Sequence, residues 1–246
     1  MTDSINQERR RALRALGVAL AGGSVSAALG CGSDAPASPS PTISTQETTT
    51  GSSACVESAS ETRGPYPDVT GMVNNPAFYR QDIREGKTGT ALTLVLTIVN
   101  TRNACAPLSG AAVEIWQCDA AGNYSEYAQP GYNGTGQTFL RGLQTTNASG
   151  QATFLTVYPG WYQGRATHIH VDVNVSGRIV KSTQIAFPEE TSRQVYASGV
   201  YASKGQNPTS NTSDMVFSDG TSTELAALNG SPSSGYTATL TVGVAV

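Results

Sequence analysis

The stretch Leu92-Thr93-Leu94-Val95-Leu96-Thr97-Ile98-Val99 decides the fold class of this chain. Leucine or isoleucine occupies every second position, and threonine or valine fills the positions between them. Successive side chains of a β-strand point to opposite faces, so this period of two predicts a strand with one strongly apolar face. Because Val95 and Val99 add apolar groups on the other side, both faces are expected to be partly covered, as in a β-sandwich.

Further strands are expected on the C-terminal side of this stretch, separated by turn signals such as Ser109-Gly110 and Ser149-Gly150. Helical periodicity is scarce after residue 55, and only residues 82–86 and 189–198 predict short helical turns. The sequence therefore predicts an all-β fold, a single antiparallel β-sandwich with long loops. The further strands are expected at residues 112–117, 152–157, 167–173, 179–186 and 236–246.

Length and charge limit the partners. A chain of 246 residues has room for one or two domains, and its charged residues amount to only 13% with a net charge of −3. Without a basic surface, binding to nucleic acid or to an anionic membrane is not expected. No heptad pattern marks an interface, so the sequence leaves the oligomeric state open and is compatible with a homo-oligomer.

Residues 1–30 have the pattern of an export signal. Arg9-Arg10-Arg11 precedes an uncharged stretch from Ala15 to Gly30, which is too short and too weakly apolar for a membrane span of about 20 strongly apolar residues. The arginines are typical of Tat-type export, and an ordinary secretory signal is the alternative. We therefore expect an exported protein that is periplasmic, held in the cell envelope as a lipoprotein, or extracellular.

Residues 31–54 are expected to form a disordered Ser/Thr/Pro-rich linker ahead of a folded domain at residues 55–246. Ala28-Leu29-Gly30-Cys31 is similar to the site at which bacterial lipoproteins are cut and acylated, although Ala28 stands where leucine is usual. A lipid anchor at Cys31 is one expectation, and an unmodified linker is the other.

Three cysteines remain, Cys55, Cys105 and Cys118, and outside the cytoplasm two of them would tend to pair. Cys105 and Cys118 are expected at opposite ends of strand 112–117. At about 3.3 Å per residue they would be too far apart for a bond that needs Cα atoms within about 7 Å. Cys55–Cys105 is the preferred pair, with Cys118 left over, although the sequence does not settle the pairing.

His168 and His170 are the only histidines, and they lie one residue apart in the predicted strand 167–173. Residues i and i+2 of a strand share a face, so both imidazoles aim at one point, as metal ligands would. The alternative is that both lie exposed on the solvent face of a sheet.

Two segments ahead of this strand each place a tyrosine where a loop meets a strand. Tyr124 lies in the segment from Val113 to Ser125, and Tyr162 lies in the segment from Thr156 to Arg165. Taken alone, both tyrosines are typical packing residues whose hydroxyl meets a backbone group.

In their order, these segments resemble the intradiol ring-cleavage dioxygenases, the non-haem ferric enzymes that include catechol 1,2-dioxygenase and protocatechuate 3,4-dioxygenase. The resemblance runs from about Gly64 to Phe217. Arg63 and Pro67 depart from the usual glutamate and second aromatic, which bears on the identity of the substrate. The short spacing from Tyr162 to His168 resembles the exported branch of the family. The matching motifs are Gly64-Pro65-Tyr66, Asp82-Ile83-Arg84, Ile115-Trp116-Gln117 with Gly122-Asn123-Tyr124, Pro159-Gly160-Trp161-Tyr162, Arg165 with His168-Ile169-His170, and Thr183-Gln184.

The resemblance implies that Fe(III) is bound by two tyrosines and two histidines. Anionic oxygen donors favour Fe(III) over Fe(II) or Zn(II), and a Lewis-acidic cation can hold a phenol, whose ordinary pKa is near 10, as phenolate. It also implies that O2 opens a catechol between its two hydroxylated carbons, giving a cis,cis-muconate-type diacid. The catechol would displace Tyr162, which then accepts a proton. The implied ligands are Tyr124, Tyr162, His168 and His170.

Three further residues acquire roles from the resemblance. Arg165 would stabilise negative charge on the ring, and its alternative is a surface salt bridge. Gln184 would orient a ligand or the substrate. Tyr66 would line the pocket, and simple loop packing is its alternative.

Two other functions stay open at this level. Turns such as Leu108-Ser109-Gly110 and Pro159-Gly160 also occur in exported, transthyretin-like β-sandwich modules that bind without catalysis, and fold does not settle function. An iron- or copper-binding protein without turnover is the second. Colour and O2 uptake would distinguish them from an oxygenase.

Overall fold

The computed structural model describes residues 55–246. The predicted export signal at residues 1–30, the linker at 31–54 and the lipid anchor at Cys31 all lie outside the described residues. Within residues 55–246, no helix is long and apolar enough to cross a membrane.

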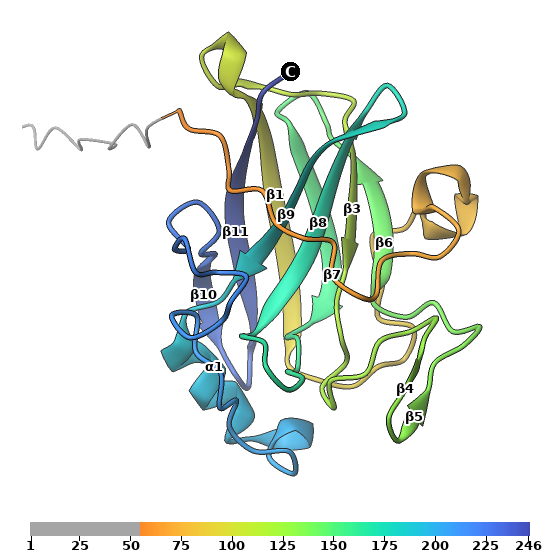
Figure 1. Ribbon diagram of the computed structural model, residues 1–246, viewed down its shortest axis with the longest axis vertical. Coiled ribbons are helices and arrows are strands. Elements are labelled where there is room, and N and C mark those ends of the chain that lie inside the picture. Colours follow the sequence, from red (N-terminus) through yellow and green to blue (C-terminus); the bar gives the residue numbers. More distant parts are fainter. Residues whose placement is uncertain (1–54) are drawn as a thin grey trace, which may run out of the picture. The chain divides into compact units, whose positions relative to one another are not determined.

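The described residues form two packed β-sheets, as predicted (Figure 1). The first sheet has β1 (Ala91–Asn100) near its centre, with β2 (Ala106–Pro107), β7 (Gln151–Val157), β10 (Ala227–Ser231) and β11 (Gly235–Val244) around it. The second has the order β6 (Arg141–Thr145), β3 (Ala112–Trp116), β8 (His168–Val175), β9 (Arg178–Ala186). The short strands β4 (Ala128–Gln129) and β5 (Tyr132–Asn133) pair with each other.

The sheets are antiparallel with one exception, which corrects the prediction. β1 pairs antiparallel with β7 and β2, but its pairing with β11 is parallel. Hairpins produce antiparallel neighbours, whereas two strands joined by a long crossover can align in the same direction. Almost the whole domain lies between β1 and β11 in the sequence, so no tight turn constrains their direction.

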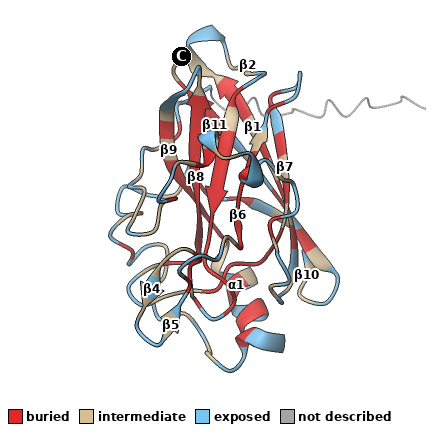
Figure 2. Cartoon of the chain, turned by 90° about the vertical axis from the view of Figure 1, so that its right-hand side faces the viewer, coloured by how far each residue is buried: buried red, intermediate tan, exposed pale blue. Residues whose placement is uncertain are grey.

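The core lies between the sheets and follows the predicted alternation. Leu92, Leu94, Leu96 and Ile98 of β1 are at most 1% exposed, and the intervening Thr93, Val95 and Thr97 are partly exposed. On β8, the inward side chains Ile169, Val171 and Val173 join the same cluster. Figure 2 shows β8 buried along nearly its whole length, on both faces.

A segment at residues 59–66, the N-terminal strap, covers the outer face of the second sheet. The Glu61 amide donates to the Ser182 carbonyl at 2.9 Å, and the Gln184 Nε2 donates to the Thr62 carbonyl at 2.8 Å. Figure 1 shows this orange segment passing across the strands. The strap explains why the outer face of β8 is buried.

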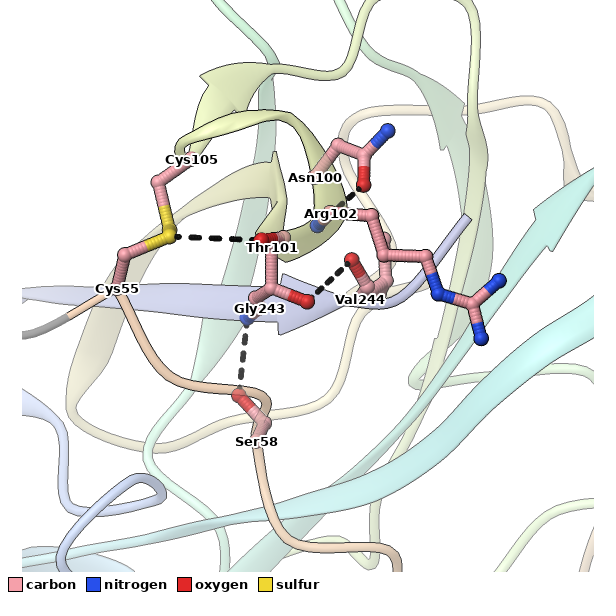
Figure 3. The surroundings of a disulfide bond; sticks show 8 residues. All are labelled: Cys55, Ser58, Asn100, Thr101, Arg102, Cys105, Gly243 and Val244. Atoms are coloured by element: carbon pink, nitrogen blue, oxygen red, sulfur yellow. Dashed lines mark hydrogen bonds between the residues drawn. A yellow bond between two sulfur atoms is a disulfide. The ribbon is translucent and has the colours of Figure 1, made fainter.

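A disulfide joins the start of the described domain to the turn between β1 and β2 (Figure 3). Cys55 and Cys105 have a Cα–Cα distance of 5.6 Å, which confirms the preferred pair, and Cys118 is free and buried. Beside the bridge, the Gly243 amide donates to Ser58 Oγ at 3.0 Å. The bridge holds the start of the described domain beside the end of β1, and the hydrogen bond holds residue 58, just ahead of the strap, against β11.

The helical content is small. α1 (Glu189–Tyr196) confirms the second predicted helical segment, and single 3-10 turns occur at Met72–Asn74, Pro76–Phe78, Thr101–Asn103 and Gly199–Tyr201. The prediction for residues 82–86 is wrong. There the Lys87 amide donates to the Arg84 carbonyl in a β-turn whose central residues, Glu85 and Gly86, have φ values of 46° and 77°. Helices need negative φ, so this turn cannot continue as one.

Candidate metal centre

Four side chains predicted to act together do lie together, at one end of the second sheet. The Nε2 atoms of His168 and His170 are 3.2 Å apart, and the Tyr124 hydroxyl is 3.4 Å from His168 Nε2. The Tyr162 ring lies 5.6 Å from the His168 ring and 5.7 Å from the Tyr124 ring, centre to centre. The alternative of two solvent-exposed histidines is wrong, because His168 is 2% exposed and His170 is fully buried.

Strand register places His170. Trp116 of β3 is its direct partner across the sheet, and the two rings stack in parallel with centres 4.7 Å apart. Gly64 of the strap comes so close that a Cβ built there would lie 3.0 Å from His170 Cε1, and its φ of 67° also favours glycine. The glycine of the Gly-Pro-Tyr motif is thus required by its contact with the imidazole.

Hydrogen bonding fixes the tautomer of His168. Its Nδ1 lies 2.6 Å from the Ala166 carbonyl, which can only accept, so Nδ1 carries the proton and Nε2 presents a lone pair toward His170. His170 Nδ1 is buried with no partner. Burial, then the Arg165 charge, lowers the pKa of His168 to about 3. Burial and the neighbouring His168 lower the pKa of His170 well below its usual range.

The two tyrosines lie in loops that are held in place by hydrogen bonds between side chains and backbone groups. Asp119 Oδ1 accepts from the Asn123 amide at 2.9 Å, and Gln129 Oε1 accepts from the Tyr124 amide at 2.6 Å. Lys204 Nζ donates to the carbonyls of Ala121, at 2.5 Å, and Trp161. This lysine therefore joins the loop that carries Tyr124 to the loop that carries Tyr162.

Both phenols are neutral unless a metal cation binds them, even though the Arg165 guanidinium lies near Tyr162. Burial raises the pKa of Tyr124 well above 10 and that of Tyr162 to about 12. Burial also raises the pKa of the adjacent Cys118 thiol to about 12, so it offers no thiolate. Two neutral imidazoles and two phenols, all converging in a buried space, form a donor set that suits a hard, strongly acidic cation such as Fe(III).

Arg165 lies beside the four side chains and is held from behind. One of its terminal nitrogens is 3.4 Å from the Tyr162 hydroxyl and 3.5 Å from His168 Nε2. Its Nε donates to both carboxylate oxygens of Asp214, at 2.9 and 3.1 Å, and its other terminal nitrogen donates to Gln184 Oε1 at 2.6 Å. Asp214 is 1% exposed, so this is not a surface salt bridge.

Asp214 is a site residue that the sequence reasoning missed. It lies far along the chain from Arg165 and carries no motif of its own. The only available signal was its position three residues before Phe217, inside the span of the family resemblance.

Tyr66 packs directly over the site. Its ring stacks on Tyr124 with centres 4.6 Å apart, and it meets the rings of Tyr127 and Tyr162 edge-on at 5.2 and 6.0 Å. Tyr66 is therefore a packing residue of its loop that also contacts both tyrosines of the centre.

Comparisons with known proteins agree with this arrangement. A sequence model of the family described as Dioxygenase matches residues 64–206. Among solved structures, the chain is similar to an intradiol ring-cleavage dioxygenase from Tetranychus urticae, at 30% identity and a TM-score of 0.70, with 78% of this chain and 95% of that chain covered. It is also similar to the dioxygenase domain of a dioxygenase carbohydrate-binding protein fusion from Streptomyces sp. SirexAA-E, at 27% identity and a TM-score of 0.57, covering 78% and 99%.

More distant structures share the fold alone. The hydroxyquinol 1,2-dioxygenase from Pseudomonas putida DLL-E4 has 15% identity and a TM-score of 0.55, with 77% of this chain and 67% of that chain covered. A search of curated proteins finds no match. The family match spans more than half of the chain and includes the four converging side chains, Arg165 and Gln184, whereas Asp214 lies beyond its end. The chain therefore belongs to the intradiol ring-cleavage dioxygenases, and it is an oxygenase of this kind.

Proposed function

We propose that this enzyme is an Fe(III) dioxygenase that cleaves a catechol between its two hydroxylated carbons with O2, giving a cis,cis-muconate-type diacid. The observation that carries the proposal is the convergence of two imidazole nitrogens and two phenols on one buried space. A transthyretin-like binding module has no use for such a donor set, because burying it costs free energy that apolar packing would not.

Tyr124, Tyr162, His168 and His170 would hold the iron. Bound there, ferric iron would act as a Lewis acid that ionises the phenols and prepares the catechol ring for O2. The histidines suit this role because both are neutral and the His168 lone pair is already oriented.

The two tyrosines differ in how firmly they are held, which supports different roles for them. Tyr124 is fully buried and stacked on Tyr66. Tyr162 is partly exposed, and its hydroxyl has a single hydrogen bond, to Arg165. Tyr162 would therefore be the side chain that gives way to substrate, and its hydroxyl oxygen would accept a substrate proton.

Arg165 would stabilise negative charge that develops on the substrate. Asp214 and Gln184 fix its guanidinium from two directions, so its free nitrogen stays aimed at Tyr162 and His168. Preorganised donors of this kind act strongly because they need no rearrangement during the reaction.

Oxygen uptake by the iron-loaded full chain tests the proposal. Catechol, hydroxyquinol and protocatechuate are supplied in turn, and the product is identified by its mass. We expect O2 consumption with a ring-opened diacid for at least one of them. Tyr162→Phe should suppress cleavage while iron stays bound, whereas Tyr79→Phe, a control at an exposed tyrosine, should behave as wild type.

Iron bound without O2 uptake would instead identify a binding protein without turnover. A colourless protein that takes up no iron would contradict the proposed metal centre itself, since ferric phenolates absorb visible light.

We also propose that the protein is exported. The twin arginines of residues 9–11 support this, and so does the Cys55–Cys105 disulfide, because such bonds persist in oxidising compartments. Cell fractionation with mass measurement of the mature N-terminus should find cleavage near residue 30, and an acyl group on Cys31 if the lipoprotein reading holds. An intact, cytoplasmic chain would contradict it.

A further inference from the structure

Three carboxylates meet outside the dioxygenase centre. Glu61 belongs to the strap, and Asp219 and Glu224 lie in the segment that leads to β10. One carboxylate oxygen of each lies within 4.8 Å of the other two. The cluster thus joins two stretches that are far apart in the sequence.

Glu224 is the residue of the cluster whose surroundings indicate a bound ligand. It is fully buried, its Oε1 accepts from Thr183 Oγ1 at 3.2 Å, and its Oε2 has no hydrogen-bond partner. Buried carboxylate oxygens almost always have partners, and those that lack one in a structure without solvent or ions mark where such a species binds. Asp219 is exposed, so the group is open to an ion from solution.

Among residues 55–246, the cluster has no unengaged cationic side chain to balance it. The nearby guanidinium of Arg165 is already engaged by Asp214 and Gln184. Burial and the neighbouring Glu61 raise the pKa of Glu224 to about 7, and burial and Asp219 raise that of Glu61. The Glu224 carboxyl therefore holds a proton up to near neutral pH unless a cation takes its place.

We propose that Glu61, Asp219 and Glu224 bind a Ca2+ ion. Ca2+ takes oxygen ligands in flexible geometry, whereas Mg2+ demands a nearly ideal octahedron and gives up its water reluctantly. Water would complete the coordination from the open side at Asp219. Three carboxylate oxygens that already lie within 4.8 Å of one another suit the more permissive ion.

The bound ion would fasten two segments that support the dioxygenase centre. The strap continues from Glu61 through Gly64 to Tyr66, and the segment that ends at Glu224 begins near Asp214. One direct tie already exists, since the Ala59 amide donates to Thr223 Oγ1 at 3.0 Å. Ca2+ should add a second and so raise the thermal stability of the whole domain.

Calcium titration of the full-length protein tests the site. In calcium-free buffer, CaCl2 is added and binding heat and Tm are measured. We expect one ion per chain and, at about a hundredfold excess over Kd, a rise in Tm of about 5 °C or more. Asp219→Asn should weaken binding at least about tenfold. Glu190→Gln, which removes an exposed carboxylate on α1, should bind as wild type.

Absence of saturable binding would overturn the proposal, as would unchanged affinity in Asp219→Asn or equal affinity for Mg2+. Glu224→Gln should also abolish binding. Should that buried variant fail to fold, Asp219→Asn still decides, because residue 219 is exposed. These readouts do not depend on ring cleavage, so the calcium site can fail while the dioxygenase proposal stands.

Discussion

The two faces of strand β8 are buried to the same extent but built differently. Ile169, Val171 and Val173 face the core between the sheets, while His168, His170 and Asp172 face outward beneath the strap. The inner face needs only apolar neighbours. Each outer side chain needs a specific polar partner, because an unpaired buried polar group is costly.

Those partners come from the strap, from the neighbouring strand β9 and from the loop just before β8. Asp172 accepts from Arg63 Nε and from Ser182 Oγ, both at 2.6 Å, and His168 Nδ1 meets the Ala166 carbonyl. Only His170 Nδ1 remains unpartnered among the side-chain nitrogens of the two histidines. The inner face of β8 therefore stabilises the fold. The outer face forms the candidate site, which the stability of the fold alone would not require.

The largest expected effect is on the outer face. His168→Ala and His170→Ala each remove one of the four proposed ligands, so iron content and O2 uptake should fall to background. Circular dichroism should show that the sheets remain, because the inner face is untouched. Wild-type iron content in either variant would show that the outer face does not hold the metal.

The inner face should respond in the opposite way. Ile169→Ala removes a fully buried side chain from the core and should lower the free energy of unfolding by about 2–5 kcal/mol. Iron binding and substrate preference should persist below the new melting temperature. Denaturant unfolding measures the loss of stability, and iron analysis of the folded variant measures metal binding. Loss of iron from a variant whose stability is unchanged would contradict the proposed difference between the two faces.

The sequence predicts much of this contrast between the two faces of β8, but not all of it. The period of two in β1 and β8 predicted both strands and the shared direction of His168 and His170. The same alternation cannot predict whether the polar face of β8 is exposed to solvent, because the strap that covers this face lies about a hundred residues earlier in the sequence. The sequence pattern did not predict β6 and β10, because Gly142, Gly230 and several polar residues break their apolar alternation.

A smaller effect is expected behind Arg165. Asp214→Asn keeps the shape of the side chain but removes the charge that pairs with the guanidinium, so kcat/KM should fall by about 10–100-fold, the range seen for residues that orient a site from behind. The fall should be mainly in kcat, with iron content and Tm near wild type. Asp82→Asn, at an exposed carboxylate, is the control. Equal kinetics in the two variants would remove Asp214 from the site.

The smallest expected effect is a pH dependence of stability from the outer face. Burial, then the adjacent Asp172, raises the pKa of Glu114 to about 7 from 4.5. Below about pH 4.5 the carboxyl is protonated in both states. Between about 4.5 and 7 only the unfolded state ionises, so Glu114 lowers stability as pH rises through that window.

Urea unfolding at pH 5, 6, 7 and 8 checks this prediction. Glu114→Gln should gain stability relative to wild type as pH increases, because it removes the buried ionisable group. A difference between the two proteins that stays constant across the range would assign the pH dependence to other groups.

The most direct test of the central claim is resonance Raman spectroscopy of the iron-loaded protein, excited in its visible absorption band. If Tyr124 and Tyr162 both bind ferric iron, the spectrum should contain tyrosinate vibrations from two phenolates, Tyr162→Phe should remove one set, and catechol should remove the same set from wild type. A protein that holds iron without tyrosinate vibrations, or whose spectrum Tyr162→Phe leaves unchanged, would contradict the account.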